Sequence, residues 1–401
     1  MKRAIILVID SMGVGAMPDA EKYGDSQACN TLANVASYNE GLDIPNLQKL
    51  GLGNITNIMG VPAVSNPLAS YGRMQELSEG KDTTTGHWEM AGLVLDKPFR
   101  VYPNGFPDEL MNEFVTRTGC KGYYANCPAS GTAIIDQYNE EHKTTGYPII
   151  YTSADSVFQV ACNIDVIPIE TLYQWCEIAR TLLGDEYNTS RVIARPYQET
   201  ANGLTRISSL RKDYSVEPMK PTILNLVQEA SGRVIAVGKI EDIFVGSGVT
   251  HAVHNGSNKE GLEQSLSIIE RTFELDSIKL TTALEDVVEH ELVFINLVDT
   301  DMLFGHRNDA VGYGNALEEI DEYMEKILSS LNEDDLLLIT ADHGCDPTQP
   351  GTDHTREYVP IIEYSKNMNP VNLECKSSFT YVARRCAEWM GVSGIPKNWA
   401  K

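Results

Sequence analysis

Acidic residues follow three of the strongest predicted strands of this chain. The runs at residues 5–9, 294–298 and 336–340 lead into Asp10, Asp299, Asp301, Asp342 and His343. Ligands of open α/β sheets bind beyond the carboxyl ends of the strands, so we expect these side chains to converge on one crevice. Crowded carboxylates repel each other strongly unless cations lie between them. The spacing therefore predicts a metal site.

Three histidines accompany these carboxylates. His306 follows Asp301 by five residues, His343 adjoins Asp342, and His354 lies further on in GTDHTRE. Mixed Asp and His ligation suits divalent Mn, Zn or Fe better than Ca or Mg. Each residue also has an ordinary interpretation, because a strand-terminal Asp often forms a turn or a helix cap and a lone His is often structural. The coincidence of three acidic strand ends with three of the eight histidines favours metal binding.

Two further histidines have a different setting. His251 and His254 lie in GVTHAVHNGS, a segment rich in Gly, Ser and Asn without carboxylates beside them. Such residues are typical of loops. We expect these two histidines to be structural.

Threonines in the segment GKDTTTGHWEMAG, residues 80–92, offer a hydroxyl nucleophile. A hydroxyl just before a helix start is well placed for phosphoryl transfer, because the first amides and the helix dipole stabilise phosphate and a bound metal lowers the hydroxyl pKa. Threonine runs also cap helices, and the local sequence leaves both interpretations open. The segment GVGAMP lacks the last Gly of GxGxxG, and Gln75 replaces the first Gly of a Walker A loop, so we expect no nucleotide site of either kind.

Short β-branched runs alternate with helical patterns along the chain. The predicted strands are residues 4–9, 234–237, 292–298, 336–339 and 359–362. A helix is predicted at residues 316–331, where apolar residues from Leu317 to Leu331 trace one face and glutamates line the other. This alternation indicates an α/β fold with a largely parallel sheet flanked by helices.

The middle of the chain differs from both ends. Residues 99–217 are rich in Gly, Pro and Tyr, with strand-like pieces at 148–152 and 191–194. We interpret them as an inserted, smaller α+β cap domain. The core domain would then be discontinuous, formed by residues 1–98 and 218–401.

Composition excludes several partners. The 401 residues carry a formal net charge of −24, with a pI near 4.7, and this field repels nucleic acid and anionic membranes. Eight cysteines without a CxxC pair indicate reduced thiols in a cytoplasmic protein. The apolar start is interrupted by Asp10, and no run reaches the ~20 apolar residues of a membrane span, so we expect neither a signal peptide nor an anchor.

Several motifs together resemble the phosphopentomutase family of the alkaline phosphatase superfamily, over nearly the whole chain. They are DSMGVG with PDA (10–20), GKDTTTGHWE (80–89), YTSADS (151–156), RVIARP (191–196), VDTDMLFGHR (298–307), TADHGCDP (340–347) and PGTDHTREYVP (350–360). The resemblance implies an alkaline-phosphatase-like core with an inserted cap. It also implies an isomerase of pentose phosphate metabolism and nucleoside catabolism.

The resemblance also implies roles for individual residues. One Mn²⁺ would be held by Asp301, His306 and His354, and a second by Asp10, Asp342 and His343. Thr83, phosphorylated in the active enzyme, would be the nucleophile. Contacts to the phosphosugar substrate would come from Ser153, Asp155, Arg191, Arg206 and Lys239, with the two arginines on the distal phosphate. A sugar bisphosphate, such as glucose 1,6-bisphosphate, would prime the enzyme.

The expected reaction interconverts ribose 1-phosphate, or its 2-deoxy analogue, with the 5-phosphate through a 1,5-bisphosphate. Thr84 stands where the family often has Met, and Cys345 stands where Asn is common; the register of the KDT motif favours Thr83 among the three threonines. The alternatives are another two-metal phosphatase, a phosphoglycerate-type mutase, or a non-catalytic metal or phosphosugar binding protein. The sequence leaves the oligomeric state open, a monomer included, as well as the metal used in the cell and the preference between the two sugars.

Overall fold

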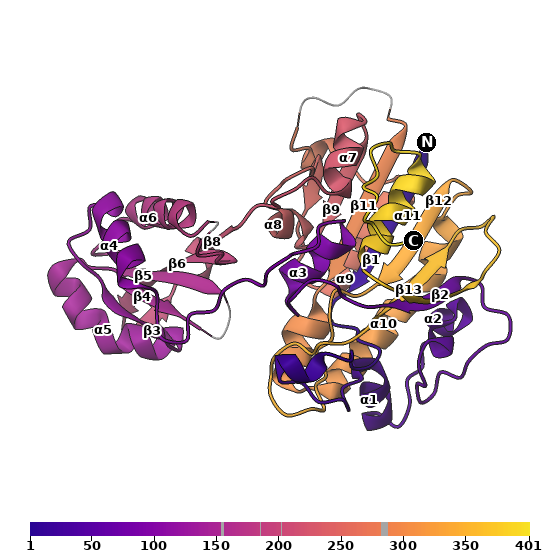
Figure 1. The fold of residues 1–401 in the computed structure, drawn as a ribbon, viewed down its shortest axis with the longest axis horizontal. Helices are drawn as coiled ribbons and strands as arrows, with labels where there is room; N and C mark the ends of the chain where they lie inside the picture. Colours follow the sequence, from indigo (N-terminus) through magenta and orange to yellow (C-terminus); the bar gives the residue numbers. More distant parts are fainter. Residues whose placement is uncertain (154–155, 185, 202, 282–287) are drawn as a thin grey trace. The chain divides into compact units, whose positions relative to one another are not determined.

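The computed structural model describes residues 1–401 except 154–155, 185, 202 and 282–287. The chain forms two compact units (Figure 1). The core unit comprises Met1–Lys97 and Pro218–Lys401, and the cap unit is Pro98–Glu217. The boundaries expected from the sequence differ from these by one residue, at Pro98.

The core unit is built on an eight-stranded sheet with the order β10-β9-β11-β1-β12-β13-β2-β14. Its strands are β1 (Lys2–Ile9), β2 (Ser70–Met74), β9 (Arg233–Val237), β10 (His251–Val253), β11 (His290–Leu297), β12 (Asp335–Thr340), β13 (Val359–Tyr364) and β14 (Asn372–Lys376). The five strands from β10 to β12 are mutually parallel, whereas β13 runs antiparallel to both of its neighbours. The mostly parallel sheet expected from the sequence is confirmed.

Helices enclose this sheet and explain its apolar strands. Seven of the eight residues of β1 and all six of β12 are buried, as expected for strands covered on both faces. The helices are α1 (Thr31–Tyr38), α2 (Pro45–Leu50), α3 (Thr83–Met90), α7 (Ile223–Glu229), α8 (Ile240–Phe244), α9 (Asn258–Ile269), α10 (Ala310–Ser330) and α11 (Thr380–Met390). Helix α10 packs against α1, α2 and α9, and α11 packs against β1, α3 and α7.

Helix α10 begins six residues earlier than the sequence predicts. The Asp309 carboxylate accepts a hydrogen bond from the Gly312 amide (2.8 Å) and caps the helix there. Gly312 and Gly314 weaken the helical pattern, but a side chain at Gly314 would lie 2.8 Å from the Asn39 amide nitrogen. Glycine at this position leaves room for the Asn39 side chain, a tertiary contact that helix propensity does not reveal, so the prediction of the helix start was wrong.

The cap unit has a mixed sheet with the order β3-β4-β5-β6-β7, and β8 also pairs with β6. Its elements are β3 (Tyr124–Pro128), β4 (Ile149–Thr152), β5 (Val157–Asn163), β6 (Arg191–Thr200), β7 (Gly203–Arg206), β8 (Lys212–Ser215), α4 (Asp108–Thr118), α5 (Gly131–Thr145) and α6 (Ile169–Leu182). Phe158 and Val160 of β5 pack with α4 and α6, whereas Ala161 packs with α5. Alternate residues of β5 thus face two separate apolar clusters, one on each side of the sheet.

Two observations bear on the environment of the chain. All eight cysteines are unpaired. Within the described residues, no helix has both the length and the hydropathy needed to cross a membrane.

Candidate metal centre and substrate cavity

Three neighbouring parallel strands, β11, β1 and β12, bring the predicted acidic residues to one edge of the core sheet. The His343 Nε2 atom lies 3.1 Å from Asp342 Oδ2 and 3.7 Å from Asp10 Oδ1. These three side chains are buried, and one potential ligand atom of each lies within 4.8 Å of the others. They form one group that can hold a cation.

A second group surrounds Asp301, which lies in the short helical segment Thr300–Phe304 after β11. Its carboxylate oxygens lie 3.3 Å from His306 Nε2 and 3.4 Å from His354 Nε2. The His354 ring stacks on the His343 ring with centroids 3.7 Å apart, so the two groups adjoin each other. Cys345 also lies within ligand distance of Asp301 and His306.

The three histidines are oriented in the same manner. Each places its Nδ1 atom at hydrogen-bonding distance from a backbone carbonyl oxygen and turns Nε2 toward the carboxylates. The acceptors for His306, His343 and His354 are the carbonyls of Thr352 (2.6 Å), Gly344 (3.1 Å) and Lys81 (2.9 Å). A carbonyl can only accept, so Nδ1 carries the hydrogen in each ring. This arrangement is typical of metal-binding histidines.

Two features of the centre are unfavourable without a bound proton or cation. His306 Nε2 and His354 Nε2 lie 3.0 Å apart, so two lone pairs face each other unless a proton or a cation lies between them. Asp10 Oδ1 is buried and accepts no hydrogen bond from any described residue. A divalent cation bound by these Asp and His side chains would accept the nitrogen lone pairs and give Asp10 Oδ1 a partner. The residues therefore fit the metal that the sequence predicts.

Burial and charged neighbours shift the pKa values of the candidate metal ligands. Burial and the nearby carboxylates of Asp342 and Asp301 raise the pKa of Asp10. Burial acts in the same direction on Asp301, but hydrogen bonds from His306 and His354 outweigh it and hold the pKa of Asp301 well below its usual range. The hydrogen bond to Asp301 raises the pKa of His306 to about 9. The centre therefore stabilises positive charge.

Thr83 is the first residue of α3. The Asp82 side chain caps this helix by accepting hydrogen bonds from the amide (3.1 Å) and the hydroxyl (2.5 Å) of Thr85. Thr85 is thereby buried in a capping role, whereas the Thr83 hydroxyl oxygen lies 3.3 Å from His343 Nε2. Of these two threonines, Thr83 is the one that faces the carboxylate and histidine groups.

Arg356 donates hydrogen bonds to the segment that precedes Thr83. Its Nη1 atom donates to Glu76 (2.6 Å) and to the carbonyls of Ser78 (2.9 Å) and Gly80 (2.6 Å). The side chain is only 3% exposed, although it lies two residues after His354. Sequence reasoning missed Arg356, because an arginine in a polar motif gives no sign of burial.

His87 is a second residue that sequence reasoning missed. It is fully buried, and its Nδ1 atom lies 2.9 Å from the Thr83 carbonyl oxygen and 3.2 Å from Asp342 Oδ2. It thus connects the helix of the candidate nucleophile to a candidate metal ligand. The signal was present in the sequence, since Thr83 and His87 are four residues apart and share one helix face.

His251 and His254 do not form a metal group with other described residues. His251 is buried beside the Thr250 hydroxyl (2.9 Å). His254 is exposed but lies 3.0 Å from a carboxylate oxygen of Glu241. The expectation that His254 has no carboxylate near it was wrong, because the turn after β9 brings Glu241 alongside.

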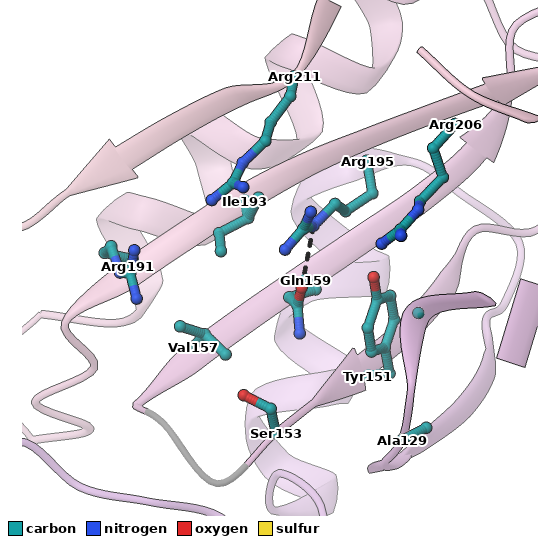
Figure 2. A pocket seen from close by; sticks show the side chains of 11 residues that line it. Ala129, Tyr151, Ser153, Val157, Gln159, Arg191, Ile193, Arg195, Arg206 and Arg211 are labelled. Carbon is teal, nitrogen blue, oxygen red and sulfur yellow. Dashed lines mark hydrogen bonds between the residues drawn. The ribbon is translucent and has the colours of Figure 1, made fainter. Parts of the chain in front are cut away.

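The expected substrate residues fall into two places. Ser153, Arg191 and Arg206 line a cavity of about 280 Å³ in the cap unit (Figure 2). Asp155 lies outside the described residues. Lys239 belongs to the core unit, where its exposed amine lies 3.7 Å from the sulfur of Met302, the residue after Asp301.

Arg195 and Arg211 also line this cavity, and sequence reasoning missed both. Arg195 could have been found, because it follows Arg191 by four residues on one strand, and side chains an even number apart lie on the same face. Arg211 follows a short 3-10 turn, so its direction depends on the tertiary structure.

Comparison with known proteins identifies the family of this chain. A family model described as Metalloenzyme superfamily matches residues 2–393. The chain is 50% identical to the phosphopentomutase of Acetivibrio thermocellus, covering 98% of this chain and 97% of the relative. It is 49% identical to the phosphopentomutase of Carboxydothermus hydrogenoformans, covering 100% and 98%. A solved phosphoglycerate mutase from Leishmania mexicana is 11% identical, with a TM-score of 0.47 over 99% of this chain and 96% of that one.

The chain is thus a metalloenzyme with an α/β fold whose acidic strand ends and histidines suit a divalent metal. More narrowly, it belongs to the phosphopentomutase family, which consists of isomerases that act as intramolecular phosphotransferases. The resemblance found in the sequence motifs is confirmed.

Proposed function

We propose that this chain interconverts ribose 1-phosphate, and its 2-deoxy analogue, with the corresponding 5-phosphate. The names of relatives that share 44–50% identity over nearly the full chain support this reaction. The observation that carries the proposal for the site is the position of the Thr83 hydroxyl, 3.3 Å from His343 Nε2 at the start of α3. A phosphate on Thr83 would adjoin the first-turn amides and the positive end of the helix.

The proposed reaction has two balanced transfers. Phospho-Thr83 gives its phosphoryl group to the free hydroxyl of the sugar phosphate: the P–O bond to Thr83 breaks, a P–O bond to the sugar forms, and the hydroxyl proton passes to Thr83. The resulting 1,5-bisphosphate then returns its other phosphoryl group to Thr83: the P–O bond to the sugar breaks, a P–O bond to Thr83 forms, and the Thr83 hydroxyl proton passes to the sugar oxygen. A sugar bisphosphate such as glucose 1,6-bisphosphate would phosphorylate Thr83 initially.

The candidate ligands divide into two sets, one of Asp10, Asp342 and His343 and one of Asp301, His306 and His354. We propose Mn²⁺ as the occupant of both, since mixed carboxylate and imidazole ligation suits it. When bound, such ions supply electrostatic stabilisation of the charge on the transferred phosphoryl group. His87 and Arg356 would hold α3 and the preceding segment in register with these ligands, and Ser153, Asp155, Arg191, Arg206 and Lys239 would bind the sugar phosphate.

The test uses the purified chain with Mn²⁺, ribose 1-phosphate and the bisphosphate primer. Phosphorus NMR should show ribose 5-phosphate, with little release of free phosphate. Thr83→Ala should abolish conversion, and mass spectrometry should no longer find a phosphorylated peptide covering residues 80–92. Thr84→Ala is the matched control and should stay active. Activity in the Thr83 variant would refute the nucleophile, and free phosphate as the main product would indicate a phosphatase.

The cellular setting is a further part of the proposal. All eight cysteines are unpaired, which supports a reducing compartment, and we propose the cytoplasm. Cell fractionation with an antibody to the chain would test this, and recovery in a membrane or secreted fraction would contradict it.

A further inference from the structure

The cap cavity carries more positive charge than the two expected arginines provide. Its lining includes four guanidinium groups, those of Arg191, Arg195, Arg206 and Arg211. Asp213 accepts two hydrogen bonds from Arg211 (2.7 and 2.6 Å) and lies 3.7 Å from Arg191. Among the described residues, no carboxylate forms an ion pair with Arg195 or Arg206. The net positive charge is therefore concentrated on these two side chains.

Arg195 is held in place without being neutralised. Its Nε atom donates to the Gln159 side-chain oxygen at 3.0 Å, and Gln159 is itself 4% exposed. Figure 2 shows this bond at the floor of the cavity, with Arg206 on the neighbouring strand. A neutral amide orients the guanidinium but leaves its charge for a ligand, which is an arrangement suited to a phosphate oxyanion.

Tyr151 supplies a hydroxyl that has no partner among the described residues. Its side chain is 1% exposed and lines the cavity, yet its hydroxyl oxygen makes no hydrogen bond. Figure 2 shows the hydroxyl turned toward the guanidinium groups of Arg206 and Arg195. A buried hydroxyl without a partner is costly. Burial raises the pKa of Tyr151 despite the arginines, so the group stays protonated and can donate.

The N-terminus of α5 lies beside the Tyr151 hydroxyl. This helix of 15 residues begins at Gly131, and the Ser130 side chain at its N-cap makes no capping hydrogen bond. A methyl group on Gly131 would lie 2.7 Å from the Tyr151 hydroxyl oxygen and 3.4 Å from Arg206 Nη1. The positive end of the helix, the hydroxyl and a guanidinium therefore adjoin each other, and only glycine leaves this space open.

The resemblance already assigns Arg206 to the distal phosphate, the one that is not being transferred. We propose that Tyr151, Arg195 and the first turn of α5 complete this subsite. This inference rests on the proposed function and adds Tyr151, Arg195 and Gly131 to the residues that recognise the substrate. Donors from four elements, β4, β6, β7 and α5, match the several oxygens of a phosphate monoester dianion better than the two oxygens of a carboxylate. Tyr151 and Gly131 then determine specificity for phosphate.

Calorimetry on the full chain loaded with Mn²⁺ tests the subsite directly. A Thr83→Ala background prevents turnover, and the titrants are ribose 5-phosphate and ribose. Adding Tyr151→Phe removes one hydroxyl and should weaken ribose 5-phosphate binding about 10-fold or more, as expected for a hydrogen bond to a charged group. Gly131→Ala should weaken it as well. Tyr214→Phe is the matched control, because its hydroxyl also has no partner but does not line the cavity.

Kinetics with the active enzyme provide a second readout. Tyr151→Phe should raise KM for ribose 5-phosphate by a similar factor and leave kcat nearly unchanged, whereas a general loss of fold would lower kcat and the melting temperature. Unchanged ribose 5-phosphate affinity in Tyr151→Phe, or equal loss in Tyr214→Phe, would overturn the subsite. A wild-type chain that binds ribose 5-phosphate through Tyr151 but fails to isomerise it would refute the proposed reaction and leave the subsite standing.

Discussion

The candidate metal centre of the core unit and the cavity of the cap unit have opposite charge. The first gathers Asp10, Asp301 and Asp342 with three histidines, and the second gathers four arginines around Tyr151. A chain with a net charge of −24 repels phosphate overall, so a phosphate substrate requires such local exceptions. One unit therefore suits cations and the other suits an anion, and the net charge of the whole chain conceals this separation.

The two regions also differ in how their charged groups are held. In the core unit, the ion pair of Arg356 and Glu76 is almost fully buried, with side chains 3% and 2% exposed. In the cap unit, Arg211 and Asp213 are 39% and 28% exposed. Buried pairs are costly to break and exposed pairs are not, so loss of the Arg356–Glu76 pair should destabilise its unit far more than loss of the Arg211–Asp213 pair.

The largest expected effect tests whether Asp301 is central to the core site. Asp301→Asn removes the carboxylate shared by His306 and His354, so we expect loss of bound metal and a fall in mutase activity of about a thousandfold or more. Asp299 is the matched control, because it accepts a hydrogen bond from the Asn258 amide (2.7 Å) and Asp299→Asn should retain metal. Elemental analysis and activity assays measure both. Full metal content in Asp301→Asn would contradict this ligand assignment.

The second prediction compares the two ion pairs. Arg356→Met leaves Glu76 buried without its partner, and should lower the free energy of unfolding of the core unit by about 3–5 kcal/mol. Arg211→Met should change that of the cap unit by less than about 1 kcal/mol, because its pair is exposed.

Chemical denaturation followed by hydrogen exchange measures the two units separately. Similar losses of stability in both variants would remove the proposed difference between the regions.

The third prediction concerns two fully buried histidines, one in each unit. His87→Gln should lower metal affinity and activity about 10- to 100-fold, because His87 orients Asp342 and the Thr83 carbonyl. His142 bridges the Tyr147 carbonyl and the Asn163 amide, so His142→Gln should reduce stability but leave metal affinity unchanged. Metal titration and thermal unfolding distinguish the two outcomes, and unaltered metal binding in His87→Gln would show that its role is only structural.

The smallest expected effect concerns His251, which lies outside the candidate metal groups. Burial, with Arg233 and Lys279 nearby and Asp276 opposing them, lowers the pKa of His251 to about 4. The unfolded chain therefore binds a proton at pH 5 that the folded chain does not, and stability falls as the pH drops below about 6.5. The loss at pH 5 should be about 2 kcal/mol.

Unfolding of the core unit at pH 7 and pH 5 measures this effect. His251→Gln should show a smaller loss between the two pH values than the wild type. An equal loss in both chains would assign the acid sensitivity to other groups.

Much of the core fold could be predicted because the strands are buried on both faces and read as continuous apolar runs. All five predicted core strands are present, and the unit boundaries lie within one residue of those expected. The start of α10 could not be predicted, because Gly314 is favoured by contact with Asn39 rather than by helix propensity. Local patterns identify elements, whereas packing decides where they begin.

The family, the fold class and the candidate ligands could be inferred from sequence, because strand-end carboxylates and motif histidines are local features that the parallel sheet brings to one edge. The orientation of these groups depends on tertiary contacts. His354 directs Nε2 toward Asp301 because its Nδ1 bonds to the carbonyl of Lys81, 273 residues away in the chain. Burial of Arg356 and His87, and the meeting of Tyr151 with Gly131, likewise depend on partners that no local pattern reveals.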